Sequence, residues 1–166
     1  MTMSNTETET IEAVAERGLS HLREIIRLGG LDAGARLTSI ESDTITLEAT
    51  GTDAGLLIGR RGQTLHAMQH LILVMLTHNE SGSQHYRLVL DADGYRKRRQ
   101  EALEQLATTL AAQVKQTGEE AVLEPLNAME RRIVHTALAE NLDVETYSEG
   151  EGLDRHVVIS PRRPGR

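Results

Sequence analysis

The chain has 166 residues, of which 39% are hydrophobic, and this size fits either one ordinary domain or two small domains with packed cores. It contains no cysteine, which excludes disulfides and thiolate-bound metal ions. No stretch approaches the roughly 18 apolar residues of a membrane span, and no targeting signal is visible. We therefore expect a soluble, cytoplasmic protein without stable membrane insertion.

The net charge of −7 is unevenly distributed along the chain. Residues 1–55 hold 4 basic and 10 acidic side chains, residues 56–115 hold 8 and 5, and residues 116–166 hold 6 and 10. A positive central segment within an acidic chain predicts modest, strongly salt-dependent binding of a polyanion. The aromatic residues are three tyrosines, which argues against the base-stacking platforms of four-stranded RNA-binding sheets.

The first half of the chain alternates helical and strand patterns. Residues 10–28 show apolar side chains at helical spacing, and residues 35–40 and 44–49 alternate around a turn, which predicts an antiparallel hairpin. A helical turn at 53–58, a longer helix at 63–77 and a strand at 86–91 follow. In the longer helix we expect an inward face made of Leu65, Met68, Leu71, Ile72, Met75 and Leu76.

Two glycines and two cations separate the helical segments of this half. The sequence Gly59, Arg60, Arg61, Gly62 forms a tight turn, and Gln63 begins the next helix. Glycine lets the main chain approach a ligand closely, and a helix N-terminus favours an anion. These five residues therefore predict a clamp for a nucleic-acid backbone.

A cluster of cations opens the second half of the chain. It lies in the first turn of a helix that runs to residue 117, where the helix dipole disfavours each cation by about 0.3 to 1 kcal/mol. We interpret the cluster as a phosphate-facing patch. The alternative is a solvated face with Lys97 paired to Glu101 and Asp93 as the N-cap. The candidate binding residues of the cluster are Arg96, Arg98 and Arg99.

A strand at 121–124, a helix at 128–139 and strands at 144–147 and 156–160 complete the second half. On the helix, Arg131 and His135 lie about 40° apart and are expected to face solvent. Arginine offers a planar fork to phosphate, and histidine donates to a phosphate oxygen or stacks on a base. Protonation of His135 is expected to strengthen binding below its ordinary pKa of about 6.5. The opposite, apolar arc contains Met129, Ile133, Val134, Ala137 and Leu138.

The order helix, strand, strand, helix, GxxG, helix, strand resembles the bacterial type II KH domain over residues 9–92. The Arg-xxx-His pair in its setting resembles the R-3-H domain of single-stranded nucleic-acid binders over residues 93–160. The expected fold class is therefore α+β, a type II KH domain (αββααβ) followed by a small α/β R-3-H domain. Residues 1–8 and 161–166 are expected to be flexible tails.

The tandem of these two domains resembles one family, the bacterial Jag or KhpB (SpoIIIJ-associated) proteins. Further matches lie at 94–99, 124–127, 130–133 and 145–150. Many members carry an extra N-terminal domain, and this chain resembles a short form without it. The resemblance therefore implies only weakly the functions that rest on that domain. Ala128 and Met129 stand where the family more often has Pro-Ala, and both substitutes favour a helix.

The resemblance implies that the GxxG loop holds the backbone of about four unpaired nucleotides. The bases are then expected along an aliphatic groove made by Ile58, Leu65 and Ile45 or Leu47. The family resemblance implies a post-transcriptional regulator or RNA chaperone linked to cell elongation and division, with single-stranded RNA as the ligand. A small protein consisting of a lone KH domain is a candidate partner. No cofactor or metal is implied.

Two other functions are left open, and an enzyme is not expected. One alternative is a protein-docking adaptor, KH-mediated and serving the membrane insertase or cell-envelope machinery, with weak nucleic-acid binding. The other is a binder of single-stranded DNA, since no residue visibly recognises a 2′-OH. His66 and His70 have the spacing of zinc peptidases, but the intervening residues supply no glutamate as general base.

Overall fold

The computed structural model describes residues 10–78 and 86–162. The chain divides into two compact units, of which unit 1 ends at Arg96 and unit 2 begins at Lys97. Across these described ranges, no helix combines the length and the apolar content needed to cross a membrane.

Unit 1 is built on a three-stranded sheet with the order β1-β2-β3. Strand β1 (Gly34–Glu41) pairs antiparallel with β2 (Thr44–Thr50), and β2 pairs parallel with β3 (Arg87–Ala92). Alternation along β2 and β3 directs every second side chain to one face, as the period of a strand requires. The buried residues on this face are Ile45, Leu47, Ala49, Leu88, Leu90 and Ala92.

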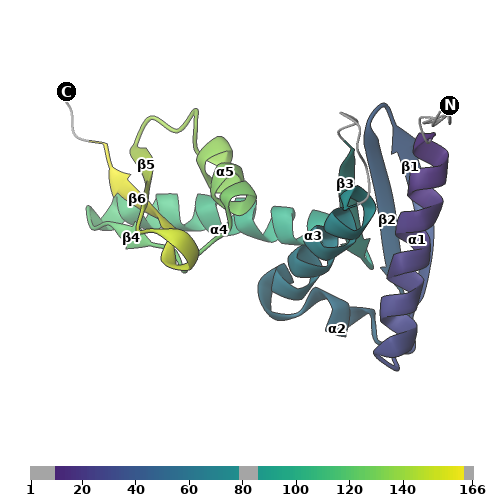
Figure 1. Ribbon diagram of the computed structural model, residues 1–166. Helices are drawn as coiled ribbons and strands as arrows, with labels where there is room; N and C mark the ends of the chain where they lie inside the picture. Colours follow the sequence, from purple (N-terminus) through teal and green to yellow (C-terminus); the bar gives the residue numbers. More distant parts are fainter. Residues whose placement is uncertain (1–9, 79–85, 163–166) are drawn as a thin grey trace, which may run out of the picture. The chain divides into compact units, whose positions relative to one another are not determined.

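Helices α1 (Ile11–Leu28) and α3 (Gln63–Thr77) cover this face of the sheet, as Figure 1 shows. The parallel pairing of β2 with β3 requires a crossover, which consists of the short helix α2 (Ala54–Ile58), the 3₁₀ turn η1 (Arg60–Gly62) and α3. The glycine-flanked turn therefore lies within the crossover that leaves the end of β2.

The buried face of α3 is narrower than the sequence predicts. Leu65, Met68, Ile72 and Leu76 are buried, whereas Leu71 and Met75 are 49% and 40% exposed. Their predicted inward orientation was wrong. Leu71 and Met75 lie beside the buried residues on the helical wheel, but outside the part of the helix surface that the sheet covers. The predicted base groove also needs correction, since Ile45, Leu47 and Leu65 belong to the core; Ile58 is half-buried.

Unit 2 contains a second three-stranded sheet, with the antiparallel order β4-β6-β5. Its strands are β4 (Ala121–Val122), β5 (Val144–Glu149) and β6 (His156–Pro161), with a 3₁₀ turn η2 (Gly152–Asp154) between the last two. Helix α4 (Tyr95–Thr117), whose first two residues belong to unit 1, and helix α5 (Ala128–Ala137) complete the fold. The buried core includes Leu103, Ala107, Ala111, Val114, Leu123, Leu126, Val134, Leu138, Val144, Val157 and Ile159.

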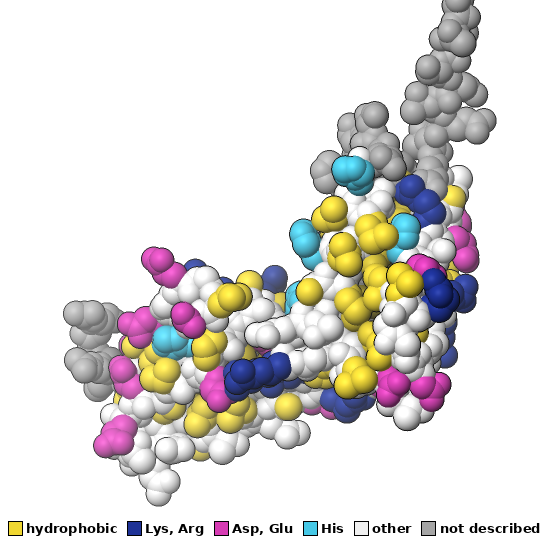
Figure 2. All heavy atoms as spheres, turned by 60° about the horizontal axis from the view of Figure 1, so that its bottom comes forward, with side chains coloured by type: hydrophobic (Ala, Val, Ile, Leu, Met, Phe, Trp, Pro, Cys, Tyr) yellow, Lys and Arg dark blue, Asp and Glu magenta, His cyan; other side chains and the backbone are white. Residues whose placement is uncertain are grey.

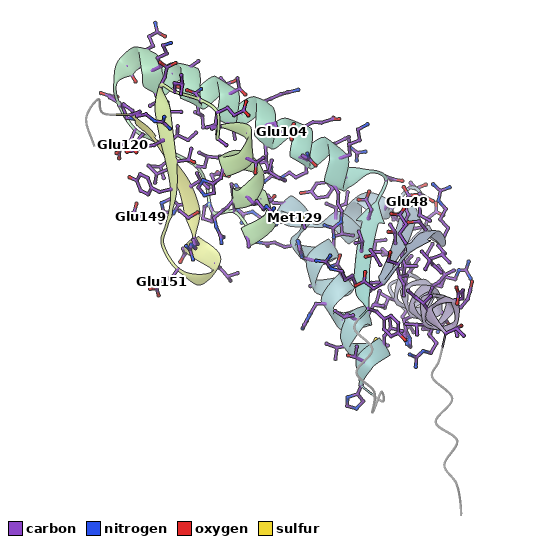
Figure 3. All side chains as sticks on the ribbon, turned by 90° about the horizontal axis from the view of Figure 1, so that it is seen from above. Glu48, Glu104, Glu120, Met129, Glu149 and Glu151 are labelled. Carbon is purple, nitrogen blue, oxygen red and sulfur yellow. The ribbon has the colours of Figure 1, made fainter. Side chains whose placement is uncertain are left out.

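Helix α5 buries only part of the apolar arc that the sequence predicts, and Ile133 is half-buried. Glu130, Val134 and Leu138 are buried, whereas Met129, at the start of α5 in Figure 3, is 60% exposed and Ala137 is exposed as well. The carboxylate of Glu130 is part of this buried face because it caps α5 and forms an ion pair with Arg99 on α4. The helix ends at Ala137, two residues earlier than predicted.

Candidate nucleic-acid interface

The turn between α2 and α3 adopts a backbone conformation that depends on its glycines. Gly59 has φ 67° and ψ −165°, a region that is essentially restricted to glycine, and Gly62 has φ 79°. Arg61 between them has φ 52°, which is uncommon for a residue with a side chain. The predicted tight turn is therefore present, and three of its four residues have positive φ.

The surroundings of both glycines leave no room for a side chain. A Cβ on Gly59 would collide with the Oγ1 of Thr64 and lie 2.6 Å from its Cβ. A Cβ on Gly62 would lie 2.8 Å from Cε1 of Tyr95. The two glycines are needed for close packing as well as for their φ values.

The cations and the helix start lie together at this turn. Arg60 is exposed, and in the described part of the chain no hydrogen bond or ion pair engages its side chain. Arg61 is half-buried and takes part in an interaction within the protein. Gln63 is exposed as the first residue of α3, and Gly62 at the N-cap position provides no side-chain cap. The positive end of the α3 dipole thus coincides with two arginines, an arrangement that favours an anion.

Arg96 lies at the start of α4 and is directed into unit 1. Its Nε donates to the carbonyl oxygen of Leu90 at 2.8 Å, and its Nη2 donates to Oε1 of Gln69 at 2.6 Å. Its backbone N–H donates to Oδ1 of Asp91 at 3.1 Å. Burial lowers the pKa of Arg96, and the charge of Asp91 partly offsets this effect. The side chain of Arg96 is therefore hydrogen-bonded within unit 1, whereas the sequence predicts that it faces a phosphate.

Arg99 also has a partner within the protein. Its Nε donates to Oε1 of Glu130 at 2.7 Å, an ion pair in which the side chains are only 26% and 10% exposed. Glu130 closes a capping box with Asn127, whose N–H donates to Oε2 of Glu130 and whose Oδ1 accepts from the Glu130 N–H. Of the basic cluster, Lys97 and Arg98 are the exposed members.

Arg131 and His135 lie one turn apart on α5, but they do not simply face solvent. Nη1 of Arg131 donates to the carbonyl oxygen of Leu126 at 2.8 Å. The ring of His135 lies between two hydroxyls of β5, with Nδ1 2.7 Å from Oγ1 of Thr146 and Nε2 3.0 Å from Oγ of Ser148. Both side chains are half-buried. The predicted solvent-facing pair is therefore corrected: His135 joins the helix to the sheet.

Burial lowers the pKa of His135, and the charge of Arg131 lowers it further. A neutral imidazole suits the site, because one ring nitrogen donates and the other accepts, and a hydroxyl can do either. The gain in affinity that the sequence predicts below pH 6.5 should therefore be displaced to lower pH. His135 is expected to be neutral where an unperturbed histidine would be half charged.

Acidification should destabilise unit 2, and replacing His135 with glutamine should remove part of this effect. In the unfolded chain the imidazole of His135 has a pKa of about 6.5, above its pKa in the folded chain. As the pH falls, the imidazole is therefore protonated first in the unfolded chain, and this favours unfolding. The stability due to His135 is thus complete above that pKa and is lost as the pH falls through the folded pKa. Denaturant unfolding from about pH 8 to pH 5, followed by amide exchange at Thr146, measures the difference between the two proteins. Parallel pH profiles would contradict the expectation.

The outer face of the unit 2 sheet is acidic. Glu120, Glu149 and Glu151 lie on the side of the sheet away from α4 and α5 in Figure 3. Desolvation raises the pKa of Tyr147 on β5, and the charges of Glu120, Glu149 and Glu145 raise it further. A polyanion would be repelled from this face. Within the described residues, no group of three or more His, Asp or Glu side chains is arranged to hold a metal ion.

Helices α2 and α3 expose apolar side chains in unit 1. Figure 2 shows hydrophobic side chains gathered on a face of this unit. The exposed large hydrophobic residues of these two helices are Leu56 on α2 and Leu71, Val74 and Met75 on α3. Such a patch is typical of a surface that contacts another molecule.

Sequence reasoning missed the residues that support the candidate site. The ring of Tyr95 lies against Gly62, Gln69 accepts a hydrogen bond from Arg96, and the hydroxyls of Thr146 and Ser148 lie within hydrogen-bond distance of His135. These contacts join residues distant in sequence and leave no local signal. The capping box is different, because Asn followed three residues later by Glu130 is a helix-start signature that was available in the sequence.

Comparison with known proteins identifies both units. Residues 31–90 match the family described as KhpA/KhpB, KH domain, and residues 101–161 match the R-3-H domain family. Among similar proteins, the RNA-binding protein KhpB of Clostridium symbiosum is 39% identical over 158 residues, which are 95% of this chain and 69% of the relative. Its namesake in Bacillus subtilis is 44% identical over 122 residues, which are 72% of this chain and 58% of the relative.

A third relative, the RNA-binding protein KhpB of Lactiplantibacillus plantarum, is 39% identical over 133 residues, which are 80% of this chain and 38% of the relative. This chain thus spans between about two fifths and about two thirds of the length of these relatives. The two domain matches and the extent of the identity agree with the α+β arrangement of the two units. The chain belongs to the KhpB family, in which a KH domain is followed by an R-3-H domain.

Proposed function

We propose that this chain binds single-stranded RNA and that the Gly59–Gly62 turn holds the sugar-phosphate backbone. The observation that carries the proposal is the exposed Arg60 beside two glycines whose φ values and close packing fix the turn at the start of α3. An anion there meets a cation and the positive end of a helix. The name RNA-binding protein KhpB, which the similar proteins carry, supports RNA as the polyanion.

Unit 2 adds a second contact in this proposal. Nη1 of Arg131 is hydrogen-bonded to the carbonyl oxygen of Leu126, and the guanidinium has further N–H donors. Arg98 is exposed on α4. Arg99 and His135 contribute mainly by holding α5 against α4 and β5. We assign the KH domain to residues 9–92 and the R-3-H domain to residues 93–160, with the qualification that Tyr95 and Arg96 pack with the first unit.

Replacing Arg60 and Arg61 together with glutamine should weaken RNA binding about 20-fold near 0.1 M salt, since each lost phosphate contact removes about 0.7 from the logarithmic salt slope of a single strand. The slope itself should fall by about 1.4. Fluorescence anisotropy of a labelled single-stranded RNA over a range of salt concentrations measures both quantities. Matched DNA and duplex probes, run in parallel, report which nucleic acid the site prefers.

Arg87→Gln is the matched control for the loss of a single charge in unit 1. Arg87 is exposed and begins β3, whereas the glycine turn follows the far end of the parallel strand β2. We expect a far smaller change in affinity and in slope than for Arg60→Gln alone. Equal effects of the two single substitutions would mean that general charge attracts the RNA, and the assignment to the turn would be wrong.

The cellular role that we propose follows the family. Regulation of transcripts after transcription, or RNA chaperoning linked to cell elongation and division, needs a protein that holds unpaired RNA without consuming it. The site supports such a role, because its groups bind and orient a backbone, and the proposal includes no catalytic step.

A protein-docking role is the second candidate, and the exposed apolar side chains of α2 and α3 favour it. The occupant would be a protein with a matching apolar surface, for which a lone KH domain is the candidate. Sedimentation of the nuclease-treated chain with a purified lone KH domain distinguishes the two functions. A complex that persists without RNA, together with millimolar RNA affinity, would favour docking.

A further inference from the structure

The glycine turn rests on the first residue of α4. Tyr95 packs against the core of unit 1, and its hydroxyl oxygen is buried. The position that a Cβ on Gly62 would occupy lies 2.8 Å from Cε1, 3.2 Å from Oη and 3.4 Å from Cζ of the Tyr95 ring. The main chain of the turn thus lies directly against the flat ring, at a distance that only glycine permits.

The next residue fixes where that ring lies. The side chain of Arg96 donates hydrogen bonds to the carbonyl oxygen of Leu90 on β3 and to the side chain of Gln69 on α3. Its backbone N–H donates to the side chain of Asp91. Oε1 of Gln69 also accepts the N–H of Leu90 at 3.1 Å. The first turn of α4 is therefore tied to β3 and to α3, the same helix that the glycine turn begins.

We propose that Tyr95 and Arg96 are positioning residues for the RNA-binding turn. Tyr95 supplies the surface on which Gly62 lies, and Arg96 holds the neighbouring Tyr95 in place through its own hydrogen bonds to α3 and β3. Neither residue contacts RNA in this proposal, which gives Arg96 a different role from the phosphate contact that the sequence predicts. The inference rests on the proposed function, because it requires the turn to be the part that holds RNA.

The support matters because the turn holds an unusual backbone before any ligand arrives. Arg61 has φ 52° and is followed by Gly62 at φ 79°, so two successive residues adopt left-handed conformations. A chain free of the ring would sample other conformations, and RNA would have to order it on binding. A turn held in place against Tyr95 avoids much of this cost. A KH fragment that ends before Tyr95 would lack the ring.

The test compares Tyr95→Ala, Tyr95→Phe and Arg96→Gln in the full chain. With a labelled single-stranded RNA of mixed sequence, we expect Tyr95→Ala and Arg96→Gln to bind about five- to tenfold more weakly, the size expected when a few groups must be ordered on binding. Tyr95→Phe keeps the ring and should bind like the native protein. The salt slope should stay unchanged in all three, because no phosphate contact is lost.

The free protein provides an independent readout. The amide signals of Gly59 and Gly62 in nuclear magnetic resonance spectra should broaden in Tyr95→Ala, as the turn exchanges between conformations, and remain sharp in Tyr95→Phe. Tyr95→Leu keeps apolar bulk without a flat ring, so it carries the test if the alanine variant does not fold. Leu22→Ala, a core change on α1, is the control for lost stability and should leave both affinity and glycine signals unchanged at a temperature where it is folded.

Two results would overturn the inference. A fall of about 0.7 in the salt slope of Arg96→Gln would make Arg96 a phosphate contact. Glycine signals that stay sharp in Tyr95→Ala or Tyr95→Leu would remove the support role. Because those signals are read without RNA, they decide the inference even if substitution of Arg60 and Arg61 leaves RNA binding unchanged, a result that would overturn the proposed function alone.

Discussion

Replacing Glu130 with alanine should lower the free energy of unfolding of unit 2 by about 3 kcal/mol, because it breaks a largely buried ion pair and a helix cap at once. Glu130 is 8% exposed. One of its carboxylate oxygens accepts a hydrogen bond from Arg99, and the other accepts one from the Asn127 N–H. The substitution leaves a mostly buried guanidinium without its partner. Denaturant unfolding of the full chain, followed by amide exchange in α5, measures the loss.

Two further variants separate the parts of this effect. Asn127→Ala removes only the cap and should cost about 1 kcal/mol. Glu130→Gln keeps an oxygen that can accept from the Asn127 N–H and removes the charge, so its cost should fall between the other two. A loss below about 1 kcal/mol for Glu130→Ala would show that Arg99 finds water or another acceptor at little cost.

The sequence predicted the elements of this fold well, but it predicted wider buried faces on two helices than the structure shows. Strand β2 alternates strictly, so its inward residues follow from the period of a strand. A helix has a continuous circumference, and its apolar arc is often wider than the surface that covers it. Leu71 on α3 and Met129 on α5 lie at the edges of such arcs and are exposed. Their exposure depends on the width of the neighbouring layer, which no local pattern specifies.

The candidate site divides in the same way. The glycine turn could be predicted because its requirement is local, namely residues without a side chain at positive φ. The partners of Arg96 and His135 could not, because Gln69 lies 27 residues from Arg96 and Thr146 lies 11 residues from His135. A cation or a histidine in a sequence shows what it can bind, but only packing shows whether a partner inside the protein already binds it.

Contact between the turn and RNA stays a prediction, but its dependence on Gly59 can be tested without RNA. Gly59→Ala should lower the free energy of unfolding of unit 1 by at least about 2 kcal/mol, since the ε region of φ and ψ is essentially closed to other residues. The new Cβ would also lie 2.6 Å from Cβ of Thr64, which is fixed to the first turn of α3 and cannot rotate away. Chemical denaturation followed by amide exchange in α3 measures this change.

Gly55→Ala is the matched control, and its expected effect has the opposite sign. Gly55 lies within α2, has no positive φ, and a Cβ built there meets nothing within 4 Å. Alanine should therefore stabilise unit 1 by about 0.5 to 1 kcal/mol, because it narrows the unfolded ensemble and favours the helix. If both substitutions are tolerated equally, the backbone of the turn adapts readily and the glycine requirement at position 59 is wrong. If only Gly59→Ala destabilises the unit, the backbone conformation at position 59 requires glycine.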